Sequence, residues 1–359
     1  MNNKRQGVII QHIFLLYSMN SILSEKKKLS VIGAGAWGTA LANLLAKKNH
    51  QVNLWVYEKD LCRIIEEKRE NVRYFPGTKL SKNITPFFDL EEAVSTNVST
   101  VIIVVPSQHV RGILKALSSF LPEDVLIVSA SKGIENGTLS TISQIYREEF
   151  SSRSSDAFAV ISGPSFAQEI SDERPSAVVA ASIKRETAKH LQELFSTHYF
   201  RIFLSSDVIG VELGGALKNV IAIAAGISDG LGNGYNSRAA LITRGLAEMI
   251  RIGNVMGAKP QTLAGLSGMG DLILTCTGEL SRNRTLGLHI GKGKSLKEIQ
   301  KEMITVAEGV ATVKSAHNLI EKHNIHAAII KETYCILYEN KNPHQAMRDL
   351  MKLHPSEEF

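Results

Sequence analysis

The chain has 359 residues, of which 44% are hydrophobic and 21% are charged, and its formal net charge is +6. This length exceeds what one hydrophobic core usually serves, so we expect two domains. The lysine and arginine residues are scattered and form no stripe interrupted by aromatic residues, which argues against nucleic acid as a partner.

The first 28 residues are predicted to be a disordered N-terminal extension. An apolar run over residues 8–17 follows two basic residues, as in a signal peptide, but it contains polar side chains and lacks a small-residue cleavage pattern. The run is also too short to span a bilayer, so we predict no membrane span there. We interpret residues 1–18 as a disordered segment or an over-called start codon.

From Leu29 onward, short runs rich in valine and isoleucine alternate with helical patterns. This alternation predicts an α/β fold with a parallel, doubly wound sheet. The predicted strands cover residues 29–33, 52–57, 101–105, 125–129 and 158–162, and strands at 177–181 and 200–204 are expected to extend the sheet. The predicted helices cover residues 39–48, 108–118 and 138–150.

The pattern changes after Ser206. Residues 207–227 form a long apolar stretch, and the remainder of the chain has the pattern of helices joined by glycine-rich loops. The stretch contains Glu212 and Lys218, and these charges argue against a transmembrane helix. We therefore predict one domain over residues 29–206 and a second, all-helical domain over residues 207–359.

A glycine-rich turn lies between the first predicted strand and the first predicted helix. In the segment Gly33-Ala34-Gly35-Ala36-Trp37-Gly38, the first glycine permits a tight turn, the second lets the backbone approach a pyrophosphate, and the third allows close packing of helix and strand. N–H groups at the helix start would hold the phosphates. The first domain is therefore predicted to be a Rossmann-type dinucleotide-binding domain.

Glu58, at the end of the second predicted strand, is placed to hold the ribose of NAD. The same residue is equally compatible with an exposed loop acid. The sequence therefore leaves the choice between NAD and NADP open.

Lys218 is the leading candidate for a catalytic residue. It lies in an apolar helical pattern, with Gly210, Gly214 and Ala222 on the same face. Burial of an unpaired lysine is unfavourable, and desolvation would lower its pKa toward neutrality, which makes it a usable proton donor and acceptor. The small residues on this face fit close approach of a ligand and tight helix packing equally well.

Asp271 is the expected partner of Lys218. It follows the flexible turn Gly268-Met269-Gly270 and precedes an apolar run. At this place an aspartate is either an ordinary helix cap or a group that orients the lysine from the helix start.

The segment Ser281-Arg282-Asn283-Arg284 is predicted to bind a phosphate. Ser281 has the character of an N-cap, yet two arginines follow in the first turn, which opposes the helix dipole. Basic residues at a helix start, where the dipole disfavours them, often mark a binding site. Helix N–H groups, a guanidinium and an amide can jointly bind a phosphate. The alternative is a solvated, charged turn.

Two more glycine turns follow predicted strands at the edge where doubly wound sheets bind ligands. Lys132 belongs to the first turn, and Gly163 and Ser165 belong to the second. These residues are expected to face the nicotinamide and the substrate. A surface lysine and an ordinary turn are the alternatives.

No metal site is predicted. The cysteines Cys62, Cys276 and Cys335 lie far apart, and His323 and His326 lack a third ligand at metal spacing. A sparse, odd number of cysteines suits a reducing compartment, so we expect a cytoplasmic protein.

Together these segments resemble the glycerol-3-phosphate dehydrogenase family, particularly its bacterial biosynthetic branch. The resemblance runs from about Leu29 to beyond Tyr338. The matching motifs are GAGAWGTALA (33–42), VVPS (104–107), SKGIE (131–135), ISGPSFA (161–167), DVIGVELGGALKNVIAIAAGISDG (207–230), ALITRGLAEM (240–249), GMGDLILTCT (268–277), SRNR (281–284) and EGV (308–310).

The resemblance implies roles for single residues. Lys218 corresponds to the family's proton donor and acceptor, and Lys132 to the lysine that contacts both cofactor and substrate. Positions that hold the glycerol phosphate fall on Gly163, Ser165, Asp271, Ser281, Arg282 and Asn283. Cofactor contacts fall on Ala36, Trp37, Tyr57, Tyr74, Ala167, Arg282, Val306 and Glu308.

The implied reaction interconverts dihydroxyacetone phosphate and sn-glycerol 3-phosphate by hydride transfer with NAD or NADP, and it supplies glycerol 3-phosphate for phospholipid synthesis. The resemblance also implies a homodimer. One alternative is a dehydrogenase of the 3-hydroxy acid type, against which the phosphate turn argues. The other is a non-catalytic dinucleotide sensor, which would not need Lys218, Lys132 and Asp271.

Overall fold

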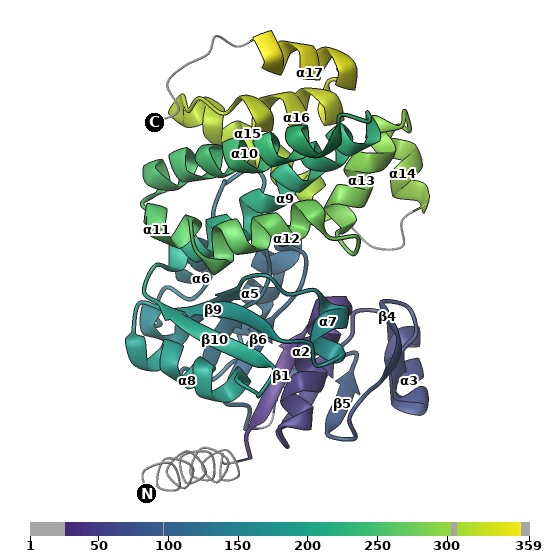
Figure 1. The fold of residues 1–359 in the computed structure, drawn as a ribbon. Helices are drawn as coiled ribbons and strands as arrows, with labels where there is room; N and C mark the ends of the chain where they lie inside the picture. The colour runs from purple at the N-terminus through teal and green to yellow at the C-terminus, as the bar shows by residue number, and fades with distance from the viewer. Residues whose placement is uncertain (1–25, 96, 303–306, 353–359) are drawn as a thin grey trace, which may run out of the picture.

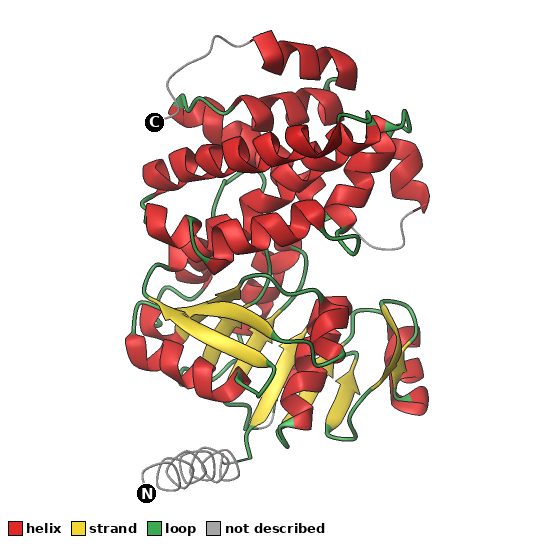
Figure 2. Cartoon of the chain, in the orientation of Figure 1, coloured by secondary structure: helices red, strands yellow, loops and turns green. Residues whose placement is uncertain are grey.

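The computed structural model describes residues 26–95, 97–302 and 307–352. Strands are confined to the N-terminal part of the chain, and the C-terminal part is built from helices stacked on one side of it (Figures 1 and 2). The predicted fold class is confirmed. The predicted extension lies outside the described residues up to residue 25, and its last residue, Lys28, already belongs to the first strand.

An eight-stranded sheet forms the centre of the N-terminal part, in the order β10-β9-β8-β7-β6-β1-β2-β5. The seven predicted strands are all present in it. The strands are β1 (Lys28–Ile32), β2 (Gln51–Trp55), β5 (Ile84–Phe87), β6 (Thr100–Ile103), β7 (Leu126–Ser129), β8 (Phe158–Ser162), β9 (Ser176–Ala181) and β10 (Phe200–Ser205).

The expectation of a wholly parallel sheet is wrong at one pair. Strand β9 runs antiparallel to β8, whereas the other neighbours are parallel. Helix α7 (Ala167–Ser171), the helix between them, has five residues and spans only about 7.5 Å, whereas a five-residue strand spans about 17 Å. Because α7 cannot carry the chain back along β8, the next strand returns in the opposite direction.

Helices cover both faces of the sheet. One hydrophobic core contains residues of α2, α3 and α8, and the other contains residues of α4, α5 and α6. The bounds are α2 (Ala36–Lys47), α3 (Lys59–Lys68), α4 (Leu90–Val94), α5 (Val110–Ser118), α6 (Ile142–Glu149) and α8 (Arg185–Phe195), with 3-10 turns η1 (Ser107–His109) and η2 (Ser155–Ala157).

Two predicted helix starts are corrected. Helix α2 begins at Ala36 rather than at residue 39, because the glycine turn already ends at Gly35. Helix α6 begins at Ile142 rather than at residue 138, because Thr141 and Gln144 form a capping box. A hairpin of β3 (Glu70–Asn71) and β4 (Phe75–Lys79), and strand β5, are absent from the sequence prediction.

The C-terminal part surrounds helix α9 (Val208–Gly230), which is almost wholly buried. Its core joins α9 to residues of α10, α12, α13, α15 and α16. The remaining elements are α10 (Gly234–Met256), α11 (Pro260–Leu263), the π-helical turn η3 (Leu266–Gly270), α12 (Asp271–Thr277), α13 (Arg282–Gly291), α14 (Leu296–Glu302), α15 (Glu308–His323), α16 (Ala328–Tyr338) and α17 (Pro343–Lys352).

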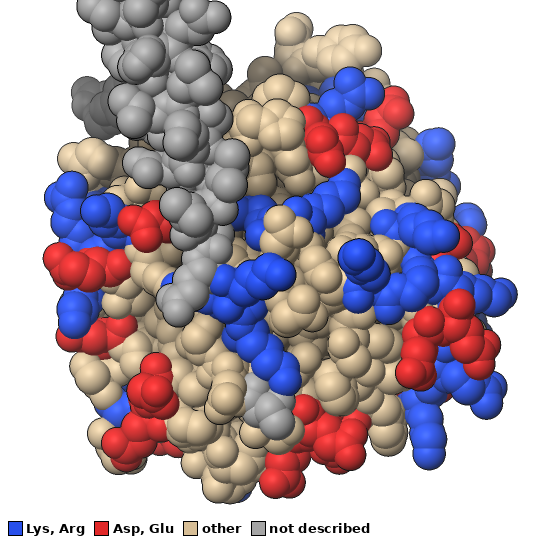
Figure 3. Space-filling view, turned by 90° about the horizontal axis from the view of Figure 1, so that it is seen from below, with Lys and Arg blue, Asp and Glu red and all other residues tan. Residues whose placement is uncertain are grey.

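Among the described helices, α9 alone is long and apolar enough to cross a membrane, and 94% of its most apolar window is buried inside the protein. It is therefore the central helix of this part of the fold. On the face seen from below in Figure 1, Lys and Arg side chains lie beside Asp and Glu side chains (Figure 3).

Candidate active site

The glycine turn between β1 and α2 has the shape that a dinucleotide requires. Gly33 has a φ of +117°, and a Cβ there would lie 2.8 Å from the carbonyl oxygen of Val104. A Cβ on Gly38 would lie 1.9 Å from the carbonyl oxygen of Gly33, so only glycine lets α2 approach the turn this closely. Gly35 faces open space and is exposed.

The start of α2 offers its polar groups to a ligand. Gly35 provides no side-chain cap for the N–H groups at Ala36 and beyond. The indole Nε1 of Trp37 is buried and has no hydrogen-bond partner among the described residues. Free helix N–H groups favour a pyrophosphate, so these residues fit the phosphates of a nicotinamide dinucleotide.

A buried carboxylate holds two lysines at the junction of the two parts. Asp271 Oδ1 accepts a hydrogen bond from Lys218 Nζ at 2.6 Å, and Asp271 Oδ2 accepts one from Lys132 Nζ at 2.7 Å. Lys218 Nζ also donates to Thr275 Oγ1 at 2.7 Å. The three charged side chains therefore form one cluster, supplied by α9, α12 and the loop after β7.

The local sequence explains why Asp271 is available to the lysines. It is the first residue of α12, and it follows the π-helical turn η3. Its carboxylate does not cap this helix, because both oxygens bind lysine ammonium groups. Thr275 lies one helical turn later, on the same face, and donates to Asp271 Oδ1 at 3.3 Å.

Burial and charge set the protonation of the cluster. Desolvation lowers the pKa of Lys218 to about 8, although the charge of Asp271 opposes this shift. The direction of this shift is the one expected from the sequence. Burial disfavours ionisation of Asp271, but the charges of Lys132 and Lys218 outweigh it and hold the pKa of this carboxyl below its usual value. A neutral-range lysine beside an ionised carboxylate suits proton transfer.

The small residues on the Lys218 face serve backbone packing. A Cβ on Gly214 would lie 2.4 Å from the carbonyl oxygen of Ser267 in η3. Close contact of α9 with η3 therefore requires glycine at this position. This contact brings Asp271, just beyond η3, to Lys218.

The turn after β8 joins the same cluster. Lys132 Nζ donates to the carbonyl oxygen of Gly163 at 3.2 Å, and Ser165 Oγ donates to the same oxygen at 3.0 Å. Lys132, Gly163 and Ser165 are thus brought together as the sequence predicts. Both turns lie at the carboxyl ends of their strands, facing the helical part.

The predicted phosphate turn lies at the start of α13. Ser281 is its N-cap and accepts from the Arg284 N–H at 3.2 Å, as predicted. Arg284 pairs with Asp229 at 2.8 Å, whereas Arg282 is exposed. The guanidinium of Arg282 therefore remains open to a ligand at this turn.

Asn283 connects this turn to the lysine cluster. Its Nδ2 donates to Asn219 Oδ1 at 2.9 Å, and its Oδ1 accepts from the Gly309 N–H at 3.0 Å. Asn219 is the neighbour of Lys218 on α9. The hydrogen bonds of Asn283 thus fix the positions of α13 and α15 relative to the catalytic candidate.

Glu308, at the start of α15, faces the same region. Burial raises the pKa of its carboxyl, while the positive charges of Arg282, Lys132 and Lys218 act to lower it. The carboxyl of Glu308 therefore interacts electrostatically with all three of these positive charges. Val306, the other predicted cofactor contact in this segment, lies outside the described residues.

The remaining predicted cofactor residues lie on the N-terminal part. Ala167 is the first residue of α7. Tyr57 is 74% exposed, with its ring edge-on to Trp55. The Tyr74 hydroxyl donates to Glu58. The two tyrosines thus flank the end of β2 rather than the lysine cluster.

Sequence reasoning missed Thr275 and Asn219. Thr275 lies four residues after Asp271, and this helical spacing was the signal that could have identified it. Asn219 is adjacent to Lys218 in sequence, but its contact with Asn283 joins residues 64 positions apart. No local pattern predicts that contact.

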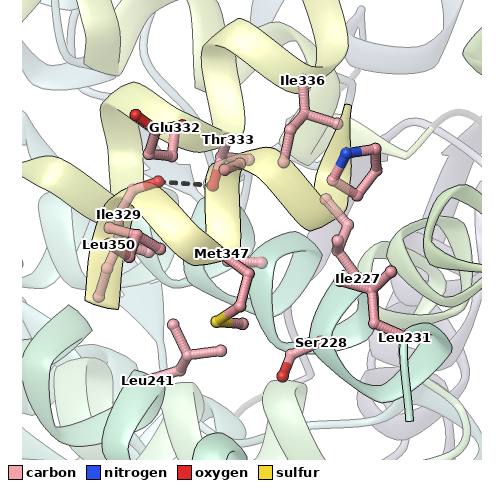
Figure 4. A pocket seen from close by; sticks show the side chains of 13 residues that line it. Ile227, Ser228, Leu231, Leu241, Ile329, Glu332, Thr333, Ile336, Met347 and Leu350 are labelled. Carbon is pink, nitrogen blue, oxygen red and sulfur yellow. Dashed lines mark hydrogen bonds between the residues drawn. The ribbon is translucent and has the colours of Figure 1, made fainter. Parts of the chain in front are cut away.

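A separate apolar cavity of about 30 Å³ lies among α9, α10, α16 and α17 (Figure 4). Its lining includes Ile227, Leu241 and Met347, and neither lysine of the cluster. A space of this size holds about one water molecule, so it cannot take a dinucleotide or a phosphorylated substrate.

Within the described residues, no three His, Cys, Asp or Glu side chains are grouped to hold a metal ion.

Two family models match the chain. The N-terminus of NAD-dependent glycerol-3-phosphate dehydrogenase matches residues 28–188, and the C-terminus of the same family matches residues 207–348. The chain belongs to the NAD-dependent glycerol-3-phosphate dehydrogenase family. The resemblance predicted from the motifs is thereby confirmed.

Individual relatives agree with this family. A glycerol-3-phosphate dehydrogenase [NAD(P)+] of Citrifermentans bemidjiense is 55% identical over 325 residues, which cover 90% of this chain and 97% of the relative. A second relative with the same name, from Geobacter metallireducens, is 52% identical over 332 residues, which cover 92% of this chain and 99% of the relative. The crystal structure of the enzyme from Coxiella burnetii matches with a TM-score of 0.88 at 39% identity, covering 91% of this chain and 99% of that one.

Proposed function

We propose that this chain reduces dihydroxyacetone phosphate to sn-glycerol 3-phosphate, and catalyses the reverse reaction, with NAD(H) or NADP(H). The observation that carries the proposal is the pair of contacts that Asp271 makes with Lys218 and Lys132 at 2.6 and 2.7 Å, buried where the loop after β7 meets the helical part. Family membership supports the same reaction.

Lys218 is the proposed proton donor and acceptor. With its pKa lowered to about 8, its ammonium form predominates near pH 7 and can protonate the substrate oxygen at C2. In the reverse direction the neutral amine accepts the proton of the C2 hydroxyl. Bound nicotinamide supplies or receives the hydride at C2.

The other substrate residues have proposed positioning roles. Lys132 and Asp271 orient Lys218, and Gly163 and Ser165 form the adjoining wall. Arg282 and the N–H groups at the start of α13, with Ser281 and Asn283 beside them, would hold the substrate phosphate. A phosphate held away from C2 orients the ketone, and such orientation supplies part of the rate enhancement.

The residues proposed to hold the cofactor are those of the glycine turn, Gly33, Gly35, Ala36, Trp37 and Gly38, with Tyr57, Tyr74, Lys132, Ala167, Arg282, Val306 and Glu308. Gly33 and Gly38 support this assignment because a Cβ on Gly33 would collide with the backbone of Val104, and a Cβ on Gly38 would collide with the turn at Gly33. The helix start at Ala36 supports it because it leaves N–H groups free for phosphate.

We also propose a dinucleotide-binding domain over residues 29–206 and a substrate and catalytic domain over residues 207–359. The end of β10 at Ser205 and the start of α9 at Val208 support this boundary. We further propose that the chain forms a homodimer and lies in the cytoplasm. Its proposed role is to supply glycerol 3-phosphate for phospholipid synthesis. Light scattering coupled to size exclusion tests the dimer.

The reaction is tested by following NADH and NADPH oxidation with dihydroxyacetone phosphate and with unphosphorylated dihydroxyacetone. We expect rapid oxidation with the phosphorylated ketone alone. Equal rates with both ketones would contradict the phosphate site. The absence of oxidation from folded protein that binds a dinucleotide would contradict the proposed reaction.

A further inference from the structure

The loop between β7 and α6 carries Lys132 into the lysine cluster. Residues 130–141 are all described and contain neither helix nor strand, so the regular main-chain ladders of such elements do not hold this loop. Its place depends instead on contacts with the segment that follows β6. The hydroxyl of Ser131 donates to the carbonyl oxygen of Val105 at 2.6 Å. The loop is thus tied to that segment directly before Lys132.

Gln108, in η1, holds the loop directly after Lys132. Its Nε2 donates to the carbonyl oxygen of Ile134 at 2.9 Å, and its Oε1 accepts from the N–H of Asn136 at 2.9 Å. Both ends of one half-buried side-chain amide therefore bind the main chain of the loop. These two bonds supply main-chain partners that a neighbouring strand would otherwise provide.

The loop also packs tightly against η1 and the start of α5. Gly133 follows Lys132, and a Cβ on it would lie 2.2 Å from Oγ of Ser107, which is only 3% exposed. Further along the loop, Arg111 Nε and Nη2 donate to the two carboxylate oxygens of Glu135 at 2.9 and 2.7 Å. The segment after β6 therefore forms one surface that fixes the loop and the main chain at Lys132.

We propose that Gln108 is a positioning residue for the reaction, because its amide holds the loop so that Lys132 reaches Asp271 and thereby keeps Lys218 oriented. The inference rests on the proposed function, since it assigns Gln108 to the same reaction. The hydrogen bonds of Gln108 go to the loop main chain and to Ser107, so it acts on the reaction through Lys132.

The charge of Lys132 provides a readout of its position. This charge lowers the pKa of Lys218, whereas the charge of Asp271 raises it. Cys276 of α12 and Glu308 of α15 also face Lys218, and burial raises the pKa of both groups. If Lys132 moves away with its loop, the pKa of Lys218 should rise. The pH at which ketone reduction declines should then rise as well.

The test compares the wild type with Gln108→Met, which keeps the length of the side chain and removes both hydrogen bonds to the loop. The measured quantities are kcat for dihydroxyacetone phosphate reduction and the midpoint of its pH profile. We expect kcat to fall by about tenfold or more, because the reacting groups lose their orientation. We expect the midpoint to move to higher pH.

Gln192→Met is the matched control. Gln192 is half-buried on α8, and its Nε2 donates to the carbonyl oxygen of Ile202 at 2.7 Å, in the edge strand β10. This substitution also removes a side-chain bond to the main chain, but at a place away from the loop. It should lower stability while leaving kcat and the midpoint of the pH profile unchanged.

Gly133→Ala tests the same loop without altering Gln108, because the added Cβ forces the loop away from Ser107. It should lower kcat and raise the midpoint of the pH profile, even if Gln108→Met does not fold. Unchanged kcat and midpoint in folded Gln108→Met, or in Gly133→Ala where Gln108→Met does not fold, would overturn this inference alone. Absence of ketone reduction by the folded wild type would overturn both the inference and the proposed function.

Discussion

Asp271 binds Lys218 through a 2.6 Å contact between Oδ1 and Nζ, deep in the junction between the sheet and the helical part. The second oxygen of the same carboxylate binds Lys132 at 2.7 Å. Two ammonium groups therefore stay close together only because one buried anion lies between them. Substitution at Asp271 should disturb both lysines at once.

Asp271→Asn removes this shared charge and retains the side-chain size. We expect turnover to fall by about 10²-fold, because the lysines lose their orientation. Without the favourable charge, the pKa of Lys218 should also fall further, which moves the pH profile to lower pH. Steady-state kinetics at several pH values measure both effects, with the exposed Asp156→Asn as the control. An unchanged profile would contradict the orienting role.

The lowered pKa of Lys218, about 8, predicts opposite pH dependence for the two reaction directions. Ketone reduction needs the ammonium form, so kcat/KM should fall as pH rises through about 8. Alcohol oxidation needs the neutral amine, so its kcat/KM should rise over the same range. Profiles from pH 6 to 10 in both directions check this, and parallel profiles would argue against Lys218 as the titrating group.

Arg282→Ala should weaken binding of the phosphorylated substrate, because the exposed guanidinium is lost from the start of α13. The KM for dihydroxyacetone phosphate is expected to rise by about tenfold or more, given the strength of arginine–phosphate hydrogen bonds. Lys292→Ala makes the same charge change at the other end of α13 and should leave KM unchanged. Equal effects of the two substitutions would indicate only a general loss of positive charge.

Glu212 on α9 links the helical part to the sheet domain. It accepts hydrogen bonds from Ser143 N at 2.7 Å and from Ser143 Oγ at 2.6 Å, at the start of α6. Burial raises the pKa of Glu212 from 4.5 to about 7 despite these bonds. Between those pH values the folded chain keeps a proton that the unfolded chain has released.

The free energy of unfolding should therefore fall as pH rises from about 4.5 to about 7 and then level off, by an amount on the order of 1–3 kcal/mol from this group. Glu212→Gln retains an acceptor for the Ser143 N–H and cannot ionise, so its stability should change less with pH. Denaturation curves at pH 5 to 7.5 measure this, with the exposed Glu123→Gln as the control. The same slope in wild type and Glu212→Gln would refute the assignment.

The sheet was largely predictable because its central strands are apolar runs such as Val101 to Ile103, buried on both faces. Strands β4 and β5 were not predicted from the sequence, since each contains a proline and lies away from the sheet centre. This omission also concealed the hairpin that carries Asn71 and Tyr74. The hydrogen bonds that join Tyr74 to Asn71 and to Glu58 therefore became visible only in the structure.

The contact between Lys218 and Asp271 was better predicted from the sequence. A lysine in an apolar helix requires a partner, and that reasoning pointed to Asp271, which the structure places against Lys218. The contact between Glu212 and Ser143 spans 69 residues and depends on how α6 meets α9. Contacts of this kind depend on tertiary packing and leave no periodic signal in the sequence.

The most direct test of the account compares dihydroxyacetone phosphate reduction by the wild type and by Lys218→Ala, with the dissociation constant of NADH measured on the same samples. The account predicts rapid reduction by the wild type and turnover lower by about 10² to 10⁴ in the variant, with NADH affinity nearly unchanged. Near-normal turnover in Lys218→Ala would contradict the assignment of Lys218 as the proton donor.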